Sequence, residues 1–453
     1  MTQPYMTTKF IVFVLAFCAA PVAGAADLLE TYHAAQTQDA VFASARAAQR
    51  AGLEKLPQGR SLLLPSVNLS ANTTYNDNWS QYRGALALPG GATLALPSGS
   101  TQFNSNGYGV SLVQPLFRRL NWVAYTEAEL QLTQTEAQFK AAEQNLIIRV
   151  AQAYFDVLIA QDSVKLAEAQ KVAITEQLEQ AKRNFEVGTS TITDTYEAQA
   201  RFDLTHSQEI AALSNLEIKK RTLQQIINAN PAELHPLGKE PKLEPPQPAD
   251  ADKWVEQAQL SSLQVIVAQA GAELAAKEVS RNRGGHYPTV DLVANYAENS
   301  TGGGAFGFGS DGHSKVIGVQ LNLPLYQGGA IQSKLREAEA NHDRSKEDLE
   351  NTRRTVALQT RQAYLGVVDG IEQVKALQQA LKSSESLLEA SKLGQEVGVR
   401  TNLDVLNAQQ QLYSTRRDLY QAEYNYLISQ LQLKAAAGTL VEEDIARINQ
   451  ALY

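Results

Sequence analysis

The sequence contains an internal duplication, and its two copies keep the same register along their helical part. The segment Ala153–Leu158 returns as Ala363–Val368, and the turn at Gly188 returns at Gly398, both 210 residues later. Upstream segments return with slightly different shifts, which places the length differences in loops. Repeats of roughly 20 to 50 residues would indicate a solenoid. A period this long indicates one structural unit that was duplicated, with two large copies packed side by side.

The first 25 residues have the pattern of a cleaved signal peptide. Lys9 supplies the positive start, Phe10–Ala20 is an apolar run, and Ala23–Ala25 is a small-residue cleavage site. A transmembrane anchor is the alternative interpretation. The apolar run is, however, shorter than the roughly 20 residues that a membrane-spanning helix needs.

The single cysteine, Cys18, lies within this leader. The mature chain is therefore expected to have no disulfide and no cysteine metal site. Cys18 could be a lipid attachment site, but such sites have a small residue directly before the cysteine, and here that residue is Phe17. A net charge of −8 over 453 residues is mild, and it argues against nucleic acid as a partner.

Each copy contains a predicted β-hairpin in which apolar and polar side chains alternate, at about residues 65–115 and 288–324. Half-burial in a soluble sandwich is the ordinary interpretation, but two hairpins so far apart in the sequence make a poor sandwich. They suit a share of a membrane barrel, with lipid on one face and a lumen on the other. Four strands cannot close a barrel alone, so several chains must share it. The apolar positions include Val67, Leu69, Ala71, Tyr108, Val110, Leu112, Val290, Leu292, Ala294, Ile317, Val319 and Leu321.

Each copy also contains a very long helical hairpin. From Leu116 to Asn230 there is no proline and one glycine, Gly188, and Asn121–Val187 alone would span about 100 Å as a helix. Apolar residues recur near the 3.5-residue step of coiled coils. A filamentous coiled coil is the alternative, and the strands argue against it. Because the helices would stop at Gly188 and Gly398, both tips are expected at the same end of the molecule, far from the strands.

Three further segments complete the predicted organisation. A helix is predicted from Asp27 to about Leu56. Residues 231–250 hold six prolines and cannot form a helix or a central strand. This linker is expected to lie along the helices as a belt, at the same height as the C-terminal segment 438–453. The chain then divides into a first repeat, 26–230, and a second repeat, 251–437.

Patterns that could indicate catalysis or metal binding are weak. Gly302–Gly307 matches the glycine spacing of dinucleotide-binding loops, but it joins two predicted strands rather than a strand and a helix. The six histidines show no spacing typical of metal ligands, and no nucleophile motif is found. The sequence predicts no enzyme, no metal and no cofactor.

The informative polar residues are at the two tips. Asp194 and Asp404 occupy equivalent positions just past the turns, with Thr193, Arg400 and Asn407 near them in sequence. Helix capping and favourable placement in the helix dipole are the ordinary reasons for such aspartates. In a ring of helices, the same positions would converge on the axis and form a ring of charge.

The chain resembles the TolC family of outer-membrane channel-tunnels over essentially all of its mature length, and it is closer to the TolC branch than to the lipidated drug-efflux branch. The motifs that carry the resemblance are Phe185–Thr189 with Ile192–Asp194, Val397–Thr401 with Leu403–Leu406, Leu323–Gly329, and Tyr424–Ile428. It implies a mixed α/β membrane protein of the Gram-negative outer membrane. Three identical chains would share a twelve-stranded β-barrel in lipid and continue into a periplasmic barrel of twelve helices.

The resemblance also implies how the periplasmic end is closed. Arg400 would bond Thr193 and Asp194 across the closed entrance, as a link between neighbouring coiled coils. Gln395 stands where a tyrosine of the family helps to latch the entrance, so part of that latch is altered here.

The same resemblance places a constriction ring and a docking surface at the tips. Asp404 would form the ring, and Asn407 stands where the closest members have a second aspartate, so that the ring carries three carboxylates rather than six. A periplasmic adaptor would dock on the tip residues Val187, Gly188, Thr189, Val397, Gly398 and Val399.

The expected function is a passive exit duct for drugs or unfolded proteins, in tripartite multidrug efflux, type I secretion or both. Adaptor docking would open the periplasmic end and couple the duct to an inner-membrane RND or ABC transporter. Two alternatives stay open at this point. One is a dedicated type I channel for protein toxins, and the other is a periplasmic structural coiled coil without a pore.

Overall fold

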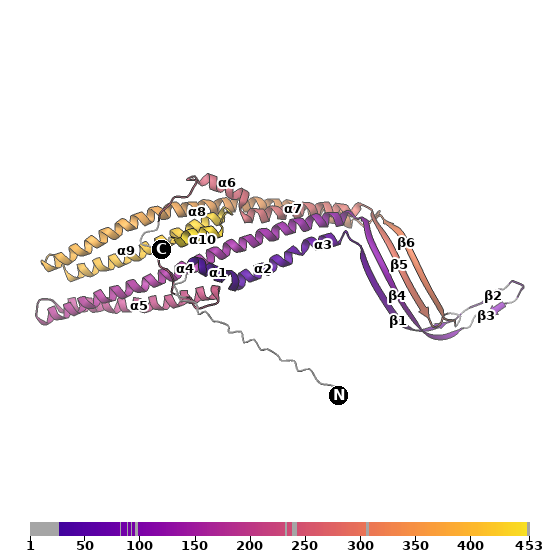
Figure 1. The fold of residues 1–453 in the computed structure, drawn as a ribbon, viewed down its shortest axis with the longest axis horizontal. Coiled ribbons are helices and arrows are strands. Elements are labelled where there is room, and N and C mark those ends of the chain that lie inside the picture. Colours follow the sequence, from indigo (N-terminus) through magenta and orange to yellow (C-terminus); the bar gives the residue numbers. More distant parts are fainter. Residues whose placement is uncertain are drawn as a thin grey trace, which may run out of the picture.

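The protein forms a long, narrow molecule with a sheet at one end and two helical tips at the other (Figure 1). This computed structural model describes residues 27–81, 83–87, 89–91, 93–95, 98–231, 233–237, 242–304 and 308–450. The predicted signal peptide at residues 1–25 lies outside the described residues. Parts of the proline-rich linker and of the Gly302–Gly307 loop also lie outside them.

The two copies follow the same order of helix, hairpin and long helical hairpin. The first copy contains α1 (Leu28–Gln38), α2 (Ala40–Leu53), α3 (Lys55–Ser61), β1 (Ser66–Ser80), β2 (Ala85–Ala87), β3 (Thr93–Ala95), β4 (Gly99–Phe117), α4 (Arg119–Glu186) and α5 (Ile192–Ile227). The second contains α6 (Ala251–Ser261), α7 (Leu263–Arg283), the 3₁₀ turn η1 (Gly284–His286), β5 (Thr289–Thr301), β6 (Ser310–Asn322), α8 (Ala330–Glu396) and α9 (Asn402–Ala436), and α10 (Glu442–Asn449) follows it.

The prediction of one helix from Asp27 to about Leu56 was wrong, because the helix breaks at Asp39. This residue takes an extended conformation, with φ −68° and ψ 120°, and its side chain accepts a hydrogen bond from the backbone N–H of Phe42 at 2.9 Å. Aspartate competes with helical backbone bonding in this way, which is why it starts helices well. Arg149 on α4 also binds the Asp39 carboxylate at 2.6 Å and so anchors the break to the long helix.

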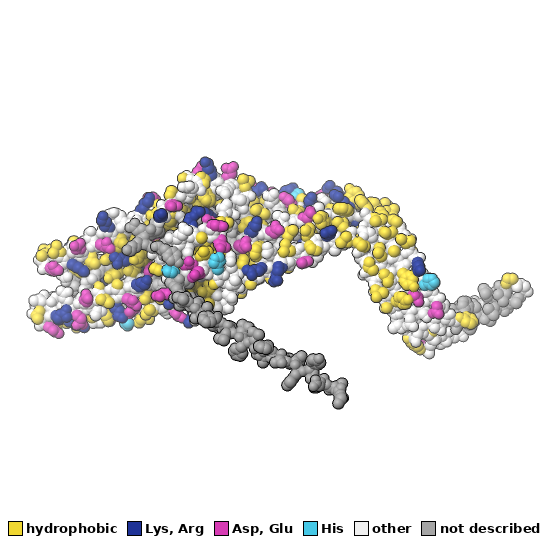
Figure 2. Space-filling view, in the orientation of Figure 1, with side chains coloured by type: hydrophobic (Ala, Val, Ile, Leu, Met, Phe, Trp, Pro, Cys, Tyr) yellow, Lys and Arg dark blue, Asp and Glu magenta, His cyan; other side chains and the backbone are white. Residues whose placement is uncertain are grey.

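The four long strands form one antiparallel sheet in the order β1-β4-β5-β6. The copies are joined where β4 pairs with β5, with Val110 opposite Tyr296. Apolar side chains share one face of this sheet and stay uncovered, with Leu69 75% and Ile317 77% exposed. Figure 2 shows hydrophobic side chains gathered over the strands. The predicted alternation is therefore present, and its apolar face has no cover within this chain's described residues.

The main hydrophobic core lies at mid-length, where α1, α4, α5, α8, α9 and α10 meet. Phe155 of α4 and Tyr424 of α9 are fully buried there, and their ring centroids are 5.5 Å apart. Toward the tips the clusters of buried apolar residues are small, and each lies within one hairpin. Buried apolar area is the dominant stabilising term in folding, so the two hairpins are held together most firmly at mid-length.

The described part of the linker and the C-terminal segment lie together at this middle level. The backbone N–H of Glu244 in the linker donates to the Tyr426 hydroxyl of α9 at 2.8 Å, and Asp444 of the C-terminal segment pairs with Lys434 of the same helix. None of the described helices has an apolar stretch long enough to cross a lipid bilayer.

Candidate channel entrance at the helix tips

Both tips are glycine turns of the same geometry. Val187 and Val397 end their helices with identical angles, φ −91° and ψ 4°, and Gly188 and Gly398 follow at φ +78° and +76°. A left-handed backbone conformation is unfavourable in free energy for a residue with a Cβ atom, whereas glycine adopts it without that cost. In the described part of the chain, no atom outside each glycine and its two neighbours lies within 4 Å of where a Cβ would stand. The turns therefore need glycine for conformation and not for space.

The returning helices begin with matching capping boxes. Thr191 and Thr401 each accept a hydrogen bond from the backbone N–H of the aspartate three residues later, Asp194 or Asp404. Each aspartate side chain in turn accepts a hydrogen bond from the backbone N–H of its threonine, at 2.9 Å and 2.8 Å. These reciprocal bonds satisfy donors that a helix start leaves free.

The same bonds set the charge state of the two carboxyl groups. Hydrogen bonds from Ser190 and from the Thr191 backbone lower the pKa of Asp194. Bonds from the Thr401 backbone and hydroxyl lower the pKa of Asp404. Donors to the ionised form stabilise it, so both tips carry a fixed negative charge at neutral pH.

Arg400 and Gln395 are the residues predicted to link the closed entrance, and in this chain both contact residues of their own tip. Arg400 Nη1 lies 3.8 Å from Asp404 Oδ1, and Gln395 Nε2 donates to Asn402 Oδ1 at 3.3 Å. Among the described residues of this single chain, Arg400 makes no bond to Asp194 or to Thr193, which lies in the first turn of α5. The predicted link joins neighbouring coiled coils, so it stays a prediction for the assembled channel.

The tips present exposed apolar side chains around the turns. Val187 is 73% exposed, Val397 65% and Val399 76%. Thr189 is also exposed, and its backbone N–H closes the first turn on the carbonyl of Asn184 at 2.8 Å. The apolar residues predicted for adaptor docking are therefore accessible at both tips of this chain.

Two residues near the tips escaped the sequence analysis. Gly394 lies under the Arg400 side chain, where an added Cβ would stand only 2.6 Å from Arg400 Cγ. Arg201 on α5 reaches across to α9 and binds Asn407, the residue predicted for the constriction ring, at 2.9 Å. No sequence motif marks Arg201, because its partner lies 206 residues away.

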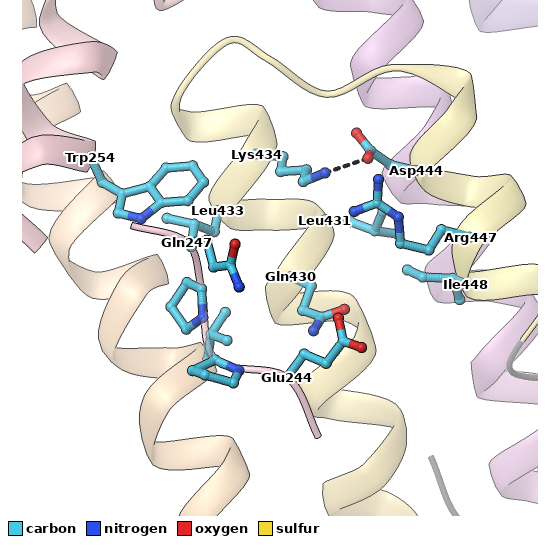
Figure 3. A pocket seen from close by; sticks show the side chains of 13 residues that line it. Glu244, Gln247, Trp254, Gln430, Leu431, Leu433, Lys434, Asp444, Arg447 and Ile448 are labelled. Carbon is cyan, nitrogen blue, oxygen red and sulfur yellow. Dashed lines mark hydrogen bonds and ion pairs between the residues drawn. The ribbon is translucent and has the colours of Figure 1, made fainter. Parts of the chain in front are cut away.

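A separate pocket of about 260 Å³ lies at mid-length between the linker, α9 and α10 (Figure 3). Trp254 and Gln247 form one side, Arg447 and Ile448 the other, and Lys434 pairs with Asp444 at the rim. The described residues contain no group of three or more His, Cys, Asp or Glu side chains that could hold a metal ion. This pocket lies far from the tips and contains none of the predicted site residues.

The chain is similar to known outer-membrane proteins along most of its length. The family model for "Outer membrane efflux protein" matches residues 31–229 and 254–439. Outer membrane protein TolC of Vibrio cholerae serotype O1 is 34% identical over 430 residues, which cover 94% of this chain and 94% of TolC. Alkaline protease secretion protein AprF of Pseudomonas aeruginosa is 32% identical over 420 residues, which cover 92% of this chain and 85% of AprF. The crystal structure of VceC from Vibrio cholerae matches with a TM-score of 0.74 at 19% identity, over 91% of this chain and 96% of VceC.

Proposed function

This chain belongs to the outer membrane efflux protein family, and we propose that it is a passive exit duct that stays closed at its helix tips until a periplasmic adaptor docks there. It is an export channel of the Gram-negative outer membrane and a transport protein rather than an enzyme. The family implies a trimeric channel. Membership also argues against the alternative of a periplasmic coiled coil without a pore.

The observation that carries this proposal is the open four-stranded sheet with its uncovered apolar face. In the described sheet β1 pairs with β4 and β6 pairs with β5, so each outer strand has one free edge. An unpaired backbone group costs several kcal/mol in lipid, and the smallest closed barrels have about eight strands. Three copies of this sheet would bring the free edges together and close a barrel.

The gate is proposed at the opposite end. Arg400 of one coiled coil would bond Thr193 and Asp194 of its neighbour, and Asp404 would form a ring of three carboxylates with Asn407 beside it. Its support is the exposure of the Arg400 side chain, which is 55% accessible and lies 3.8 Å from its nearest carboxylate. An exposed ion pair contributes little free energy. Three symmetry-related links would therefore hold the entrance closed and still yield to an adaptor.

We also propose how the chain is divided between these tasks. The repeats 26–230 and 251–437 would each supply one hairpin to the barrel and one to the tunnel. The linker at 231–250 and the segment 438–453 would form an equatorial belt. Contacts of Glu244 with Tyr426 and of Asp444 with Lys434, both on α9, support this placement.

The proposed partners are a periplasmic adaptor at the tips and an inner-membrane RND or ABC transporter that supplies drugs or unfolded proteins. A second candidate function is a dedicated type I channel for secreted proteins. The similarity to the alkaline protease secretion protein AprF favours it. Deleting the gene and measuring both drug susceptibility and the proteins released into the medium separates the two functions. Loss of secretion with unchanged drug tolerance would favour the dedicated channel.

Assembly and gating are tested on purified protein. We expect a trimer in mild detergent and a small conductance in planar bilayers, which Arg400→Ser should raise. Arg417→Ser is the matched control, because Arg417 is exposed on α9 and binds only its neighbour Asp418 among the described residues. A stable monomer with intact strand content would rule out the shared barrel. Equal conductance of the Arg400→Ser and native channels would rule out the proposed link.

A further inference from the structure

Arg201 joins the two helical hairpins of one chain close to the tips. Its Nη1 donates to Gln410 Oε1 at 2.5 Å, and its Nη2 donates to Asn407 Oδ1 at 2.9 Å. Asn407 and Gln410 are three residues apart and share one face of α9. One planar guanidinium therefore engages both amide oxygens at once, a geometry that a lysine ammonium would not reproduce.

A second bridge joins the same hairpins at a higher level. The Tyr424 hydroxyl of α9 donates to Asp162 Oδ2 of α4 at 3.0 Å, and the Tyr424 ring packs on Phe155 in the main core. At about 1.5 Å of rise per residue, Tyr424 lies roughly 33 Å along α9 and Arg201 roughly 14 Å along α5. The hairpins are thus fixed within the core at one level and held by a polar contact nearer the tips.

Apolar packing gives little support between these two levels. One small cluster, of Leu178, Ala181 and Ala198, lies within the first hairpin. The other, of Val374, Leu419 and Ala422, lies within the second. Neither cluster contains residues of both hairpins, and beside Arg201 only a few apolar side chains, such as Ile174 and Leu406, face one another across the hairpins around a small cavity.

The tip halves of the hairpins also contain buried polar atoms that lack a hydrogen-bond partner in the described part of the chain. They are Gln177 Oε1, Thr195 Oγ1 and Gln409 Oε1. A buried acceptor without a partner has lost its bonds to water, which lowers the stability of the packed arrangement. These atoms lower the stability of the packed tip halves, so a specific contact there has an influence on their position.

The geometry points to Arg201 as an intrasubunit lock, which holds α9 against α5 in the closed channel and must release before the second hairpin can move away from the first. This inference rests on the proposed opening at the tips. It adds a contact inside each chain to the proposed Arg400 links between chains. Because Asn407 is neutral, the lock uses a charged donor and two neutral acceptors, an arrangement that can be strengthened or removed by single substitutions.

The first test removes the lock. Arg201→Gln should raise the conductance of trimers in planar bilayers, through a roughly threefold to tenfold shift of each chain toward the open arrangement. Arg221→Gln is the matched control, because Arg221 lies on the same helix and binds Glu217 and Gln224 of that helix. Recovery of heat-stable trimers for both variants shows that any change in conductance comes from the entrance and not from assembly.

The second test uses a substitution that should strengthen the lock. Asn407→Asp gives Arg201 a carboxylate partner, and hydrogen bonds to an ionised acceptor are stronger. We expect lower conductance in the native background and no such decrease when Arg201→Gln is also present. A purely structural role of Arg201 does not predict this dependence. An equal effect of Asn407→Asp in both backgrounds would overturn the lock.

The third test measures the hairpins directly. The mature chain is expected to lack cysteine, so spin labels can be attached at Ser207 of α5 and Arg417 of α9 in trimers built mostly from unlabelled chains. Arg201→Gln should lengthen and broaden the distance between the labels, and an unchanged distribution would contradict the lock. The conductance results separate the lock from the proposed gate. If Arg400→Ser raises the conductance and Arg201→Gln does not, the lock is wrong and the proposed gate stands. If neither variant changes it, gating at the tips is wrong, and the lock with it.

Discussion

Ser190 and Arg400 occupy the same position of the duplicated tip, two residues past the glycine, and they do different things there. Ser190 donates a hydrogen bond to Asp194 at 2.6 Å, while the Arg400 guanidinium lies 3.8 Å from Asp404. The two tips are otherwise built alike, from the glycine turn to the capping box. At this position the two copies therefore differ in charge, with a neutral hydroxyl in the first tip and an exposed guanidinium in the second.

Gly398→Glu is expected to abolish export and leave the trimer intact, because it places a charged side chain on the surface proposed for adaptor docking. Gly398→Ala should have a smaller effect, since it adds only the strain of a Cβ at φ +76°. Export of a reporter cargo and the amount of heat-stable trimer are measured together. Gly328→Glu is the control, because Gly328 also has positive φ and open surroundings but lies beside the sheet. Normal export by Gly398→Glu would move the docking site elsewhere.

Asp404→Asn should reduce the cation preference of the channel and its block by trivalent cations. Three carboxylates near one axis form a ring of charge that attracts cations, and the substitution removes all three charges with little change in shape. Asp418→Asn is the matched control, because Asp418 lies on the same helix in an exposed pair with Arg417 and outside the proposed gate. Reversal potential and block are measured in planar bilayers. Equal effects of the two variants would place the ring at another level of the tunnel.

Cation preference should persist as the pH falls from neutral and disappear only below the ordinary aspartate pKa of 3.8. The Thr401 bonds lower the pKa of Asp404 in the folded protein, so the ionised form is the stabilised one. Its stabilising contribution is complete above the ordinary pKa and is lost as the pH falls through the lowered value. Thr401→Val removes the hydroxyl bond of 2.8 Å and should shift the loss of cation preference to higher pH. The reversal potential is recorded against pH, and identical profiles for both channels would contradict this account.

Asp291→Asn is expected to destabilise the junction between sheet and helices by about 1–3 kcal/mol. Arg118, just before α4, binds Asp291 of β5 through two bonds of 2.7 Å and 2.6 Å, and the Asp291 side chain is only 12% exposed. This pair ties the first copy to the second where the chain leaves the sheet. Heating of detergent-solubilised trimers should show a melting temperature lower by a few degrees. Asp348→Asn, in an exposed pair with Arg344 at 3.6 Å, should leave it unchanged.

Much of the architecture follows from local patterns. The long helices were predicted to stop at Gly188 and Gly398, and the structure ends α4 at Glu186 and α8 at Glu396, two residues before each glycine. The strands follow from strict alternation of apolar and polar side chains. The ends of the two returning helices also correspond in the repeat. Asn228 and Gly438 are equivalent positions, and both take positive φ.

Other features depend on contacts between distant residues, which a single sequence does not reveal. The break at Asp39 could have been found from its capping chemistry, but apolar spacing on both sides favoured one continuous helix. The pairing of β4 with β5 joins segments far apart in the chain, and no local signal selects it. Arg201 was missed for the same reason, since arginine on a helix surface is ordinary until its partner on α9 is known.

The open sheet has a consequence for the inheritance of defects in this protein. A chain whose outer strand cannot pair leaves a gap in the barrel that its two neighbours cannot close, however sound they are. A mutant chain produced together with normal chains would therefore inactivate most of the trimers that contain it. Mutations in β1 or β6 are expected to act dominantly, whereas mutations that stop the chain from leaving the cytoplasm would remain recessive.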